Sequence, residues 1–185
     1  TLSPFSGSGR VRRLAIGNPP GFSAGTAFAL RDVRVDVDLK SIKGDHIVVN
    51  EIVIDGPELT FEGSLKGSNL AAIQKNVSSA APSSGGSSSG GPERKIEIGL
   101  FKVTNGVVRV KVKELGGSGF SVPLPDVELR GIGKGGGVTP AQAAQKMLGA
   151  MTGSALNAAT GSITKELTKS AGGLQKVFKG WLLKN

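Results

Sequence analysis

The feature that most constrains the fold is an alternating pattern that occurs twice in the chain. Residues 47–61 read IVVNEIVIDGPELTF, and residues 96–110 read IEIGLFKVTNGVVRV. When the segments are aligned, the polar pair Asp55-Gly56 falls on Thr104-Asn105. The apolar residues that coincide are Ile47 with Ile96, Val49 with Ile98, Ile52 with Phe101, Ile54 with Val103, Leu59 with Val108, and Phe61 with Val110. Alternation predicts strands and the polar pair predicts a tight turn, so each unit is expected to be a strand–turn–strand hairpin. Such units build a sheet with one apolar face, which favours binding or bridging over catalysis.

Further strands are predicted at 9–18, 29–39 and 127–132. The clearest is ALRDVRVDVDL at 29–39, where apolar residues alternate with charged ones, so that only one side of the strand is apolar. Within 9–18 the alternation is imperfect.

Helices are predicted at 68–77 and from Pro140 onwards. The first has Ser68 or Asn69 as its cap, and the second has Thr139 as its cap with proline at its first position. The fold class expected is therefore α+β, mainly β: a curled antiparallel sheet with two related hairpin units, a short helix and C-terminal amphipathic helices. The domain organisation expected is a β domain at 1–139, with a flexible Ser/Gly linker at 78–92, and a helical segment at 140–185.

The net charge of +9 is uneven, because residues 140–185 hold six lysines and one acidic residue, Glu166. A basic excess favours anionic partners, either nucleic acid or an acidic lipid surface. Nucleic acid is the less favoured partner, since the basic residues are not interleaved with aromatic ones and no nucleic-acid motif is present.

The C-terminal segment has two distinct faces from Ile163 onwards. At about 100° per residue, one face is apolar and the opposite face is basic. Two main interpretations stay open: a helix that packs on the sheet with its lysines in water, and an interfacial helix with lysines at acidic headgroups. A surface for a partner protein is a third. The residues of the membrane-surface hypothesis are Lys165, Lys169, Lys176, Lys179, Phe178 and Trp181.

Residue types that carry catalysis or bind metals are scarce in the sequence. It has no Cys and a single His, His46, at the entry to a predicted strand, so zinc-site spacings are excluded. The glycines at 133–137 lack the ending of a P-loop and are better explained as a strand-to-helix joint than as an anion site. Asp32, Asp36 and Asp38 are better explained as a solvated strand face than as a cation site. No catalytic residue, metal site or cofactor is expected.

No run of about 18 apolar residues occurs, so no membrane-spanning helix is predicted within the chain. The sequence begins at Thr1 rather than Met, so an upstream signal or anchor is left open.

The run from Leu14 to Glu62, followed by SNLAAI, resembles the AsmA-like family of bacterial envelope proteins, and the likeness covers about residues 9–160. The motifs that carry it are the Ile-Gly-Asn-Pro-Pro-Gly-Phe turn at 16–22, the Val-x-Val-x-Leu strand at 35–39, the Ile-x-Ile-x-Gly-Pro segment at 52–57, the Asn69-Leu70 pair, and Leu-Pro-Asp-Val-Glu-Leu at 124–129 with Ile132-Gly133.

The resemblance implies a periplasmic body tethered to the inner membrane by an N-terminal helix, which this chain does not contain. It implies a sheet that curls into an apolar groove, and a role in phospholipid movement or outer-membrane maintenance. The chain is much shorter than the long members of the family, so long-range lipid conduction is not expected of one copy.

The function expected is therefore non-enzymatic: to hold or pass phospholipid acyl chains along an apolar groove. The alternative is a structural or assembly protein of the envelope that binds a protein partner and no lipid. Phospholipid or a membrane surface, and other envelope proteins, are the partners considered; the oligomeric state is left open. The candidate lining is Val33, Val35, Val37, Ile52, Ile54, Phe101, Val103 and Val108, and ordinary core packing under the C-terminal helix explains each of these residues as well.

Overall fold

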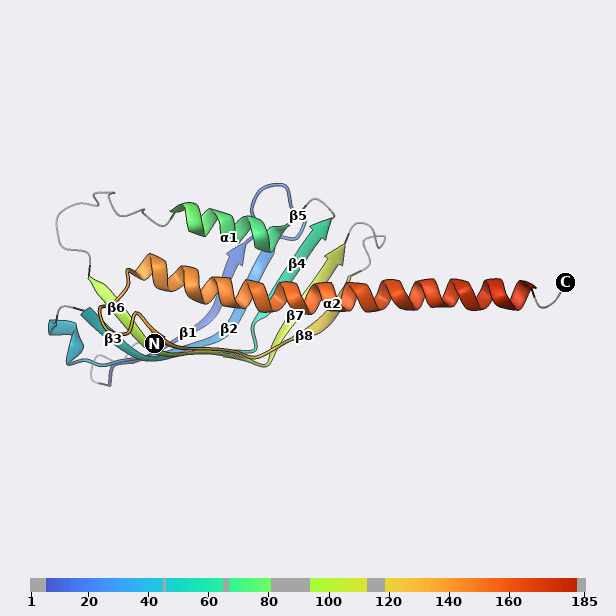
Figure 1. Ribbon diagram of the computed structural model, residues 1–185. Helices are drawn as coiled ribbons and strands as arrows, with labels where there is room; N and C mark the ends of the chain where they lie inside the picture. Colours follow the sequence, from blue (N-terminus) through green and yellow to red (C-terminus); the bar gives the residue numbers. More distant parts are fainter. Residues whose placement is uncertain (1–5, 45, 65–66, 81–93, 113–118, 183–185) are drawn as a thin grey trace.

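The computed structural model describes residues 6–44, 46–64, 67–80, 94–112 and 119–182. These residues form one open sheet of nine strands with two α-helices on one side of it (Figure 1). The mainly β, α+β fold class is confirmed.

The elements agree closely with the segments that alternation and capping predict. The strands are β1 (Ser8–Gly17), β2 (Thr26–Val37), β3 (His46–Asp55), β4 (Glu58–Ser64), β5 (Gly67–Ser68), β6 (Lys95–Thr104), β7 (Gly106–Val112), β8 (Phe120–Leu124) and β9 (Val127–Ile132). The helices are the 3-10 turn η1 (Ser41–Lys43), α1 (Asn69–Ala80) and α2 (Pro140–Leu182).

The predicted hairpins are wrong, because β3 and β4 form one bent strand. Both pair with β2 in a single antiparallel register, in which Asp32 lies opposite Asp55 and Ala29 opposite Glu58. The expected turn residues Gly56 and Asn105 have φ angles of 60° and 56°. That left-handed conformation suits a tight turn, but here it bends the strand without reversing it.

The same continuity joins β6 to β7 and β8 to β9, so the sheet consists of five long strands and the short β5. The two repeated units lie side by side and parallel, which corrects the expectation of a purely antiparallel sheet. Their register pairs Ile47 with Ile96 and Leu59 with Val108, the same pairs that the sequence alignment of the repeats gives.

Positive φ angles occur at the same level in three of the five long strands, at Arg13, Gly56 and Asn105. The registers align Arg13, Arg31, Gly56, Asn105 and Pro125 across the sheet, and we call this line the crease. On crossing the crease, the positions whose side chains face the helices shift by one residue along each strand. The sheet curls towards the helices (Figure 1).

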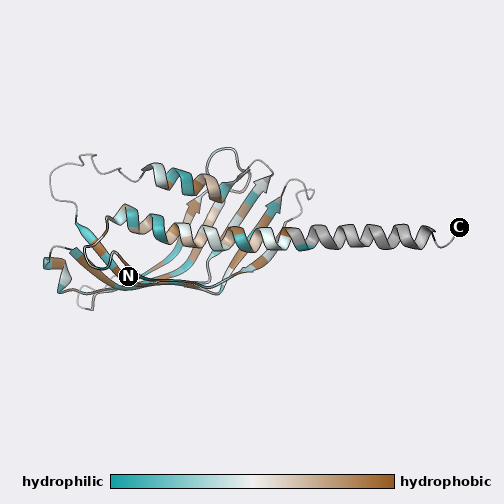
Figure 2. Cartoon of the chain, in the orientation of Figure 1, coloured by the Kyte–Doolittle hydropathy of each residue, from teal (hydrophilic) through white to brown (hydrophobic). Residues whose placement is uncertain are grey.

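The core lies between the inner face of the sheet and the two helices. Buried residues of the strands, such as Phe28 and Phe101, pack with Leu70 of α1 and with Met151 and Ala155 of α2. The alternation of hydrophobic and hydrophilic residues along the strands is visible in Figure 2. Burial on one side of the sheet explains why the strands alternate.

The predicted C-terminal helices are a single helix, α2, which continues through Gly172-Gly173 without a break. Thr139 caps it: its hydroxyl oxygen accepts a hydrogen bond from the Gln142 N–H at 3.1 Å, and the Gln142 side chain accepts one from the Thr139 N–H at 3.0 Å. The helix extends well beyond the β8 side of the sheet (Figure 1).

Candidate functional site

The predicted lining residues all lie on the inner face of the sheet. Neighbouring strands place Val33, Ile54 and Val103 in one transverse row. The rows on either side are built in the same way, and directly opposed residues share a face. The neighbouring rows are Val35–Ile52–Phe101–Leu129, Val37–Val49–Ile98–Ile132 and, across the crease, Phe28–Leu59–Val108–Val122.

The helices cover only part of this face. α2 packs on β4 and on β6 to β9, and α1 packs on β4, β5 and α2. Half of the candidate lining is therefore ordinary core, since these residues are at most 5% exposed: Ile54, Phe101, Val103 and Val108. The other half is only partly buried: Val33, Val35, Val37 and Ile52.

The inner face stays apolar as far as the edge strand β1, where three large side chains are exposed. Val11 is 47% exposed, Leu14 44% and Ile16 40%. They lie opposite Val33, Leu30 and Phe28 of β2. We call these three residues together with Val33, Val35, Val37 and Ile52 the open strip. A sheet face in water is usually polar, so this exposed apolar surface is the candidate binding surface of the described residues.

Sequence reasoning missed the contribution of β1 because its alternation is interrupted. Val11 belongs to one phase, and Leu14 and Ile16 to the other. The interruption is Arg13, whose φ of 60° places it on the crease. The alternation in β1 changes phase at Arg13, as the alternation in the two repeats does at Asp55-Gly56 and Thr104-Asn105. This shared change of phase is the signal that could have identified Val11, Leu14 and Ile16.

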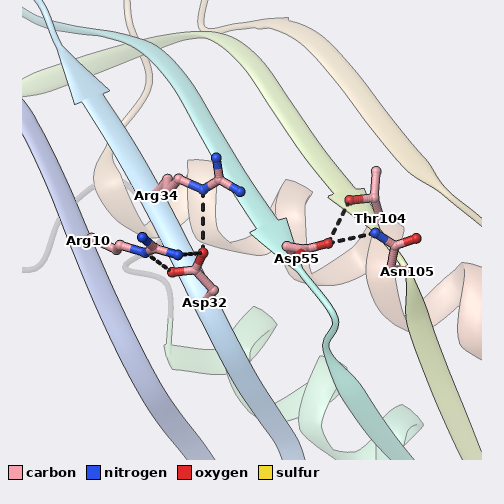
Figure 3. A network of polar contacts seen from close by, with 6 residues as sticks. All are labelled: Arg10, Asp32, Arg34, Asp55, Thr104 and Asn105. Atoms are coloured by element: carbon pink, nitrogen blue, oxygen red, sulfur yellow. Dashed lines mark hydrogen bonds and ion pairs between the residues drawn. The ribbon is translucent and has the colours of Figure 1, made fainter.

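The opposite, outer face carries a network of charged side chains beside the crease (Figure 3). Asp32 accepts two hydrogen bonds from Arg10, one of them 2.6 Å from Arg10 Nη2 to Asp32 Oδ2, and its Oδ2 lies 3.4 Å from Arg34 Nε. The hydrogen bonds from Arg10 lower the pKa of Asp32; burial opposes this, and the charges of Arg10, Arg34 and Arg12 reinforce it. The same contacts raise the pKa of Arg10.

A second carboxylate, Asp55, lies directly opposite Asp32 in the ladder. It accepts hydrogen bonds from Asn105 Nδ2 at 2.8 Å and from Thr104 Oγ1 at 3.3 Å (Figure 3). Two adjacent carboxylates would repel one another, but each has its own donors. The hydrogen bonds of Asp32 therefore join β1 to β2, and those of Asp55 join β3 to the end of β6.

The aspartates considered as a cation site are engaged in local contacts. Besides Asp32, Asp36 accepts a hydrogen bond from the Asn50 side chain and Asp38 accepts one from the Lys40 N–H. Within the described residues, no group of three or more His, Cys, Asp or Glu side chains is arranged to hold a metal ion.

A buried amide joins the loop between β1 and β2 to the start of α1. Asn69 is fully buried; its Oδ1 accepts a hydrogen bond from the Glu62 N–H, and its Nδ2 donates to Asn18 Oδ1 and to the Thr60 carbonyl, both at 2.7 Å. Asn18 Nδ2 in turn donates to the Ala24 carbonyl. The motif residues Asn18 and Asn69 thus meet at one structural junction.

Glu62 completes this junction and was not singled out by the sequence. Its carboxylate accepts hydrogen bonds from the Ser23 N–H at 2.7 and 2.9 Å and from the Ala24 N–H at 2.8 Å. Burial alone would raise the pKa of Glu62, but these hydrogen bonds and the charge of Lys111 outweigh it and hold the pKa below its ordinary value.

The remaining sequence candidates lie in structural positions. His46 begins β3, with Nε2 3.8 Å from a carboxylate oxygen of Glu97. The glycines at 133–137 form the joint between β9 and α2, where Gly133, Gly135 and Gly137 have positive φ angles.

Lys165 is exposed on α2. The other residues of the membrane-surface hypothesis lie on the same helix, but their side chains are outside the described part: Lys169, Lys176, Phe178, Lys179 and Trp181. Of the helices described, none combines the length and apolar character that crossing a bilayer requires.

Comparison with known proteins gave no match to a family model, to a curated protein or to a solved structure.

Proposed function

We propose that this protein holds or passes phospholipid acyl chains along the open strip, as a non-enzymatic envelope protein of AsmA type. The observation that carries the proposal is the exposure of Val11, Leu14 and Ile16 at the uncovered end of an apolar face that the helices cover in part. Transfer from water to such a surface is worth about 0.8 kcal/mol per methylene, so an acyl chain needs no specific polar contact there.

The sheet geometry supports an elongated ligand. The strip runs along β1 and β2 on both sides of the crease, and the curl turns it towards the helices (Figure 1). The outer face, by contrast, carries the ion pairs of Asp32 beside the crease, which disfavours apolar ligands there.

The resemblance of the sequence to AsmA-like proteins extends the proposal to a location and a role. The body would lie in the periplasm, tethered to the inner membrane, and would support outer-membrane maintenance. The projecting part of α2 would lie on the acidic membrane surface through its lysine face. Its separation from the sheet supports this part of the proposal (Figure 1).

Native mass spectrometry of the protein, gently purified from bacterial membranes, tests the proposal when lipids are extracted from the same sample. We expect stoichiometric phospholipid on the wild type and loss of it in Leu14→Asp and Ile16→Asp. The matched control is Ala15→Asp, which adds the same charge to the same strand on the outer face and should retain lipid.

A lipid-free mass for the wild type, or equal retention by all three variants in folded form, would reject the lipid-holding strip. The second candidate, an assembly protein of the envelope, would then be favoured, because the exposed strip would still require a cover. Cross-linking in membranes would identify the protein that supplies it.

A further inference from the structure

A hollow of about 240 Å³ opens on the outer face of the sheet, at the crease. Ala15, Ala29 and Glu58 follow one another across the strands there, in a row that alternates with the buried inner row of Phe28 and Leu59. The two alanines leave the space open, and two arginines of the crease border it. Sites for drug-sized ligands have roughly 300–1,000 Å³, so this hollow suits a small group.

Arg13, the first of these arginines, holds an unfavourable backbone conformation. Its φ of 60° lies in the left-handed region, which costs free energy for residues other than glycine and asparagine. At the same level, the neighbouring strands have Gly56 and Asn105, which adopt positive φ more readily. Among the described residues, Arg13 has no hydrogen-bond or ion-pair partner that would offset this cost. Strain at such a charged side chain is typical of a binding site.

Arg31, the second arginine, keeps most of its donors available. Its side chain is 76% exposed, and its Nη2 lies 3.5 Å from Glu58 Oε1 with no hydrogen bond between the two side chains. The Glu58 carboxylate is instead bound by Arg109, whose Nη2 donates a hydrogen bond to Glu58 Oε2 at 2.7 Å. One arginine therefore neutralises the only carboxylate that lines the hollow, and the guanidinium groups of Arg13 and Arg31 remain for a ligand.

We propose that this hollow binds a terminal phosphate group between the guanidinium groups of Arg13 and Arg31. Each guanidinium presents a fork of N–H donors that matches two phosphate oxygens. A terminal phosphate has three acceptor oxygens and a charge of about −1.5 to −2, so it can serve both forks. The other carboxylates beside the crease, Asp32 and Asp55, have donors of their own and do not line the hollow.

The site is independent of acyl-chain binding, because the hollow and the open strip lie on opposite faces of the sheet. Two sources can supply a terminal phosphate. One is a soluble phosphate ester, and the other is a lipid with a terminal phosphate, such as phosphatidic acid, at a membrane surface.

An NMR titration of the isotope-labelled full chain with glycerol 3-phosphate tests the site, with sodium chloride at the same ionic strength as the reference. We expect saturable shifts of the backbone N–H signals of Ala15 and Ala29. Arg13→Gln or Arg31→Gln should weaken binding by about tenfold. The control is Arg12→Gln, which removes the same charge from the next residue of β1, outside the hollow, and should weaken binding by less than about twofold.

Co-sedimentation with vesicles distinguishes the two sources. Phosphatidylcholine vesicles that contain phosphatidic acid are compared with vesicles of equal charge that contain phosphatidylglycerol, whose phosphate is a diester. Tighter binding to phosphatidic acid that Arg13→Gln abolishes would assign the site to a lipid headgroup. Equal binding to both vesicles, with saturable shifts in the NMR titration, would assign it to a soluble ester.

Arg13→Gly separates the side chain from the backbone strain. Glycine relieves the positive φ, so this variant should melt at a higher temperature than the wild type and still lose about tenfold in phosphate binding. Full phosphate binding by Arg13→Gly would overturn the proposal. Signals that respond equally to sodium chloride, or an equal loss of binding in Arg12→Gln, would overturn it too.

Discussion

At the scale of residues, stability depends on a few buried polar groups that join distant segments. Asn69 contacts the 18–25 loop through Asn18 and contacts β4 through Thr60 and Glu62. A buried donor or acceptor that loses its partner costs about 1–3 kcal/mol, so this one side chain controls the position of the loop and of α1.

Replacement of Asn69 by Ala should lower the free energy of unfolding by about 3 kcal/mol, because the partners of Asn69 are left buried without hydrogen bonds. Urea unfolding measures this effect. Asn76→Ala, on the exposed side of the same helix, is the matched control and should change stability by less than about 0.5 kcal/mol. Equal effects in the two variants would contradict the role given to Asn69.

Glu62 should make stability depend on acid. Its pKa in the folded protein is below the ordinary value of 4.5, so the ionised form is the one that folding favours. The contribution is complete above that value and is lost as the pH falls from about 4.5 through the lower folded pKa. Asp32 has a lowered pKa as well and contributes in a similar range below 3.8.

Urea unfolding at several pH values between 7 and 3 should therefore show a smaller acid loss in Glu62→Gln than in the wild type. The part that Asp32 contributes should remain in the variant. An unchanged pH dependence in Glu62→Gln would show that the carboxylate is not selectively stabilised by folding.

At the scale of elements, alternation and capping predicted the strands and the start of both helices. The candidate lining residues share one face, as period two predicts for the residues on each side of the crease. The pairing of β3 with β4 was predicted wrongly, because glycine or asparagine with positive φ serves a turn and an in-strand bend equally well. The burial of Ile54 and Val108 under the helices could not be predicted, because it depends on tertiary packing and the periodicity of a strand carries no information about that.

Asn105 tests the bend directly. Asn105→Gly keeps access to positive φ and loses the hydrogen bond to Asp55, whereas Asn105→Val adds backbone strain of about 1–2 kcal/mol. We expect the Val variant to be less stable than the Gly variant by about that amount in urea unfolding. The control is Lys102→Val, which places the same side chain in the same strand outside the crease and should be tolerated. Equal stabilities of Asn105→Gly and Asn105→Val would contradict the bend.

At the scale of the whole molecule, the sheet and the helices that cover it each extend beyond the other on one side. The strands continue apolar beyond the helices at β1, and α2 continues beyond the sheet past β8 (Figure 1). One molecule therefore presents an apolar surface at one end and a long helix at the other, which fits a protein that works at a lipid surface or beside another molecule.

The projecting helix should bind anionic vesicles through its lysines. Each contributes about 1 kcal/mol near an acidic membrane, so replacing Lys169, Lys176 and Lys179 by Gln should weaken binding by about 100-fold. Co-sedimentation with phosphatidylglycerol vesicles measures this. A triple variant at the exposed residues Lys40, Lys43 and Lys75 is the charge-matched control, and wild-type binding as strong to neutral vesicles would contradict the electrostatic attachment.

The crease has a consequence for how the chain finds its register. Arg13, Gly56 and Asn105 have positive φ angles at one level of the sheet, so a slip of one of these strands by one position brings its positive-φ residue beside a regular part of its neighbour. The error then appears in the shape of the backbone as well as in the side chains that it misplaces. The three aligned residues thus act as a common alignment mark for the register of the sheet.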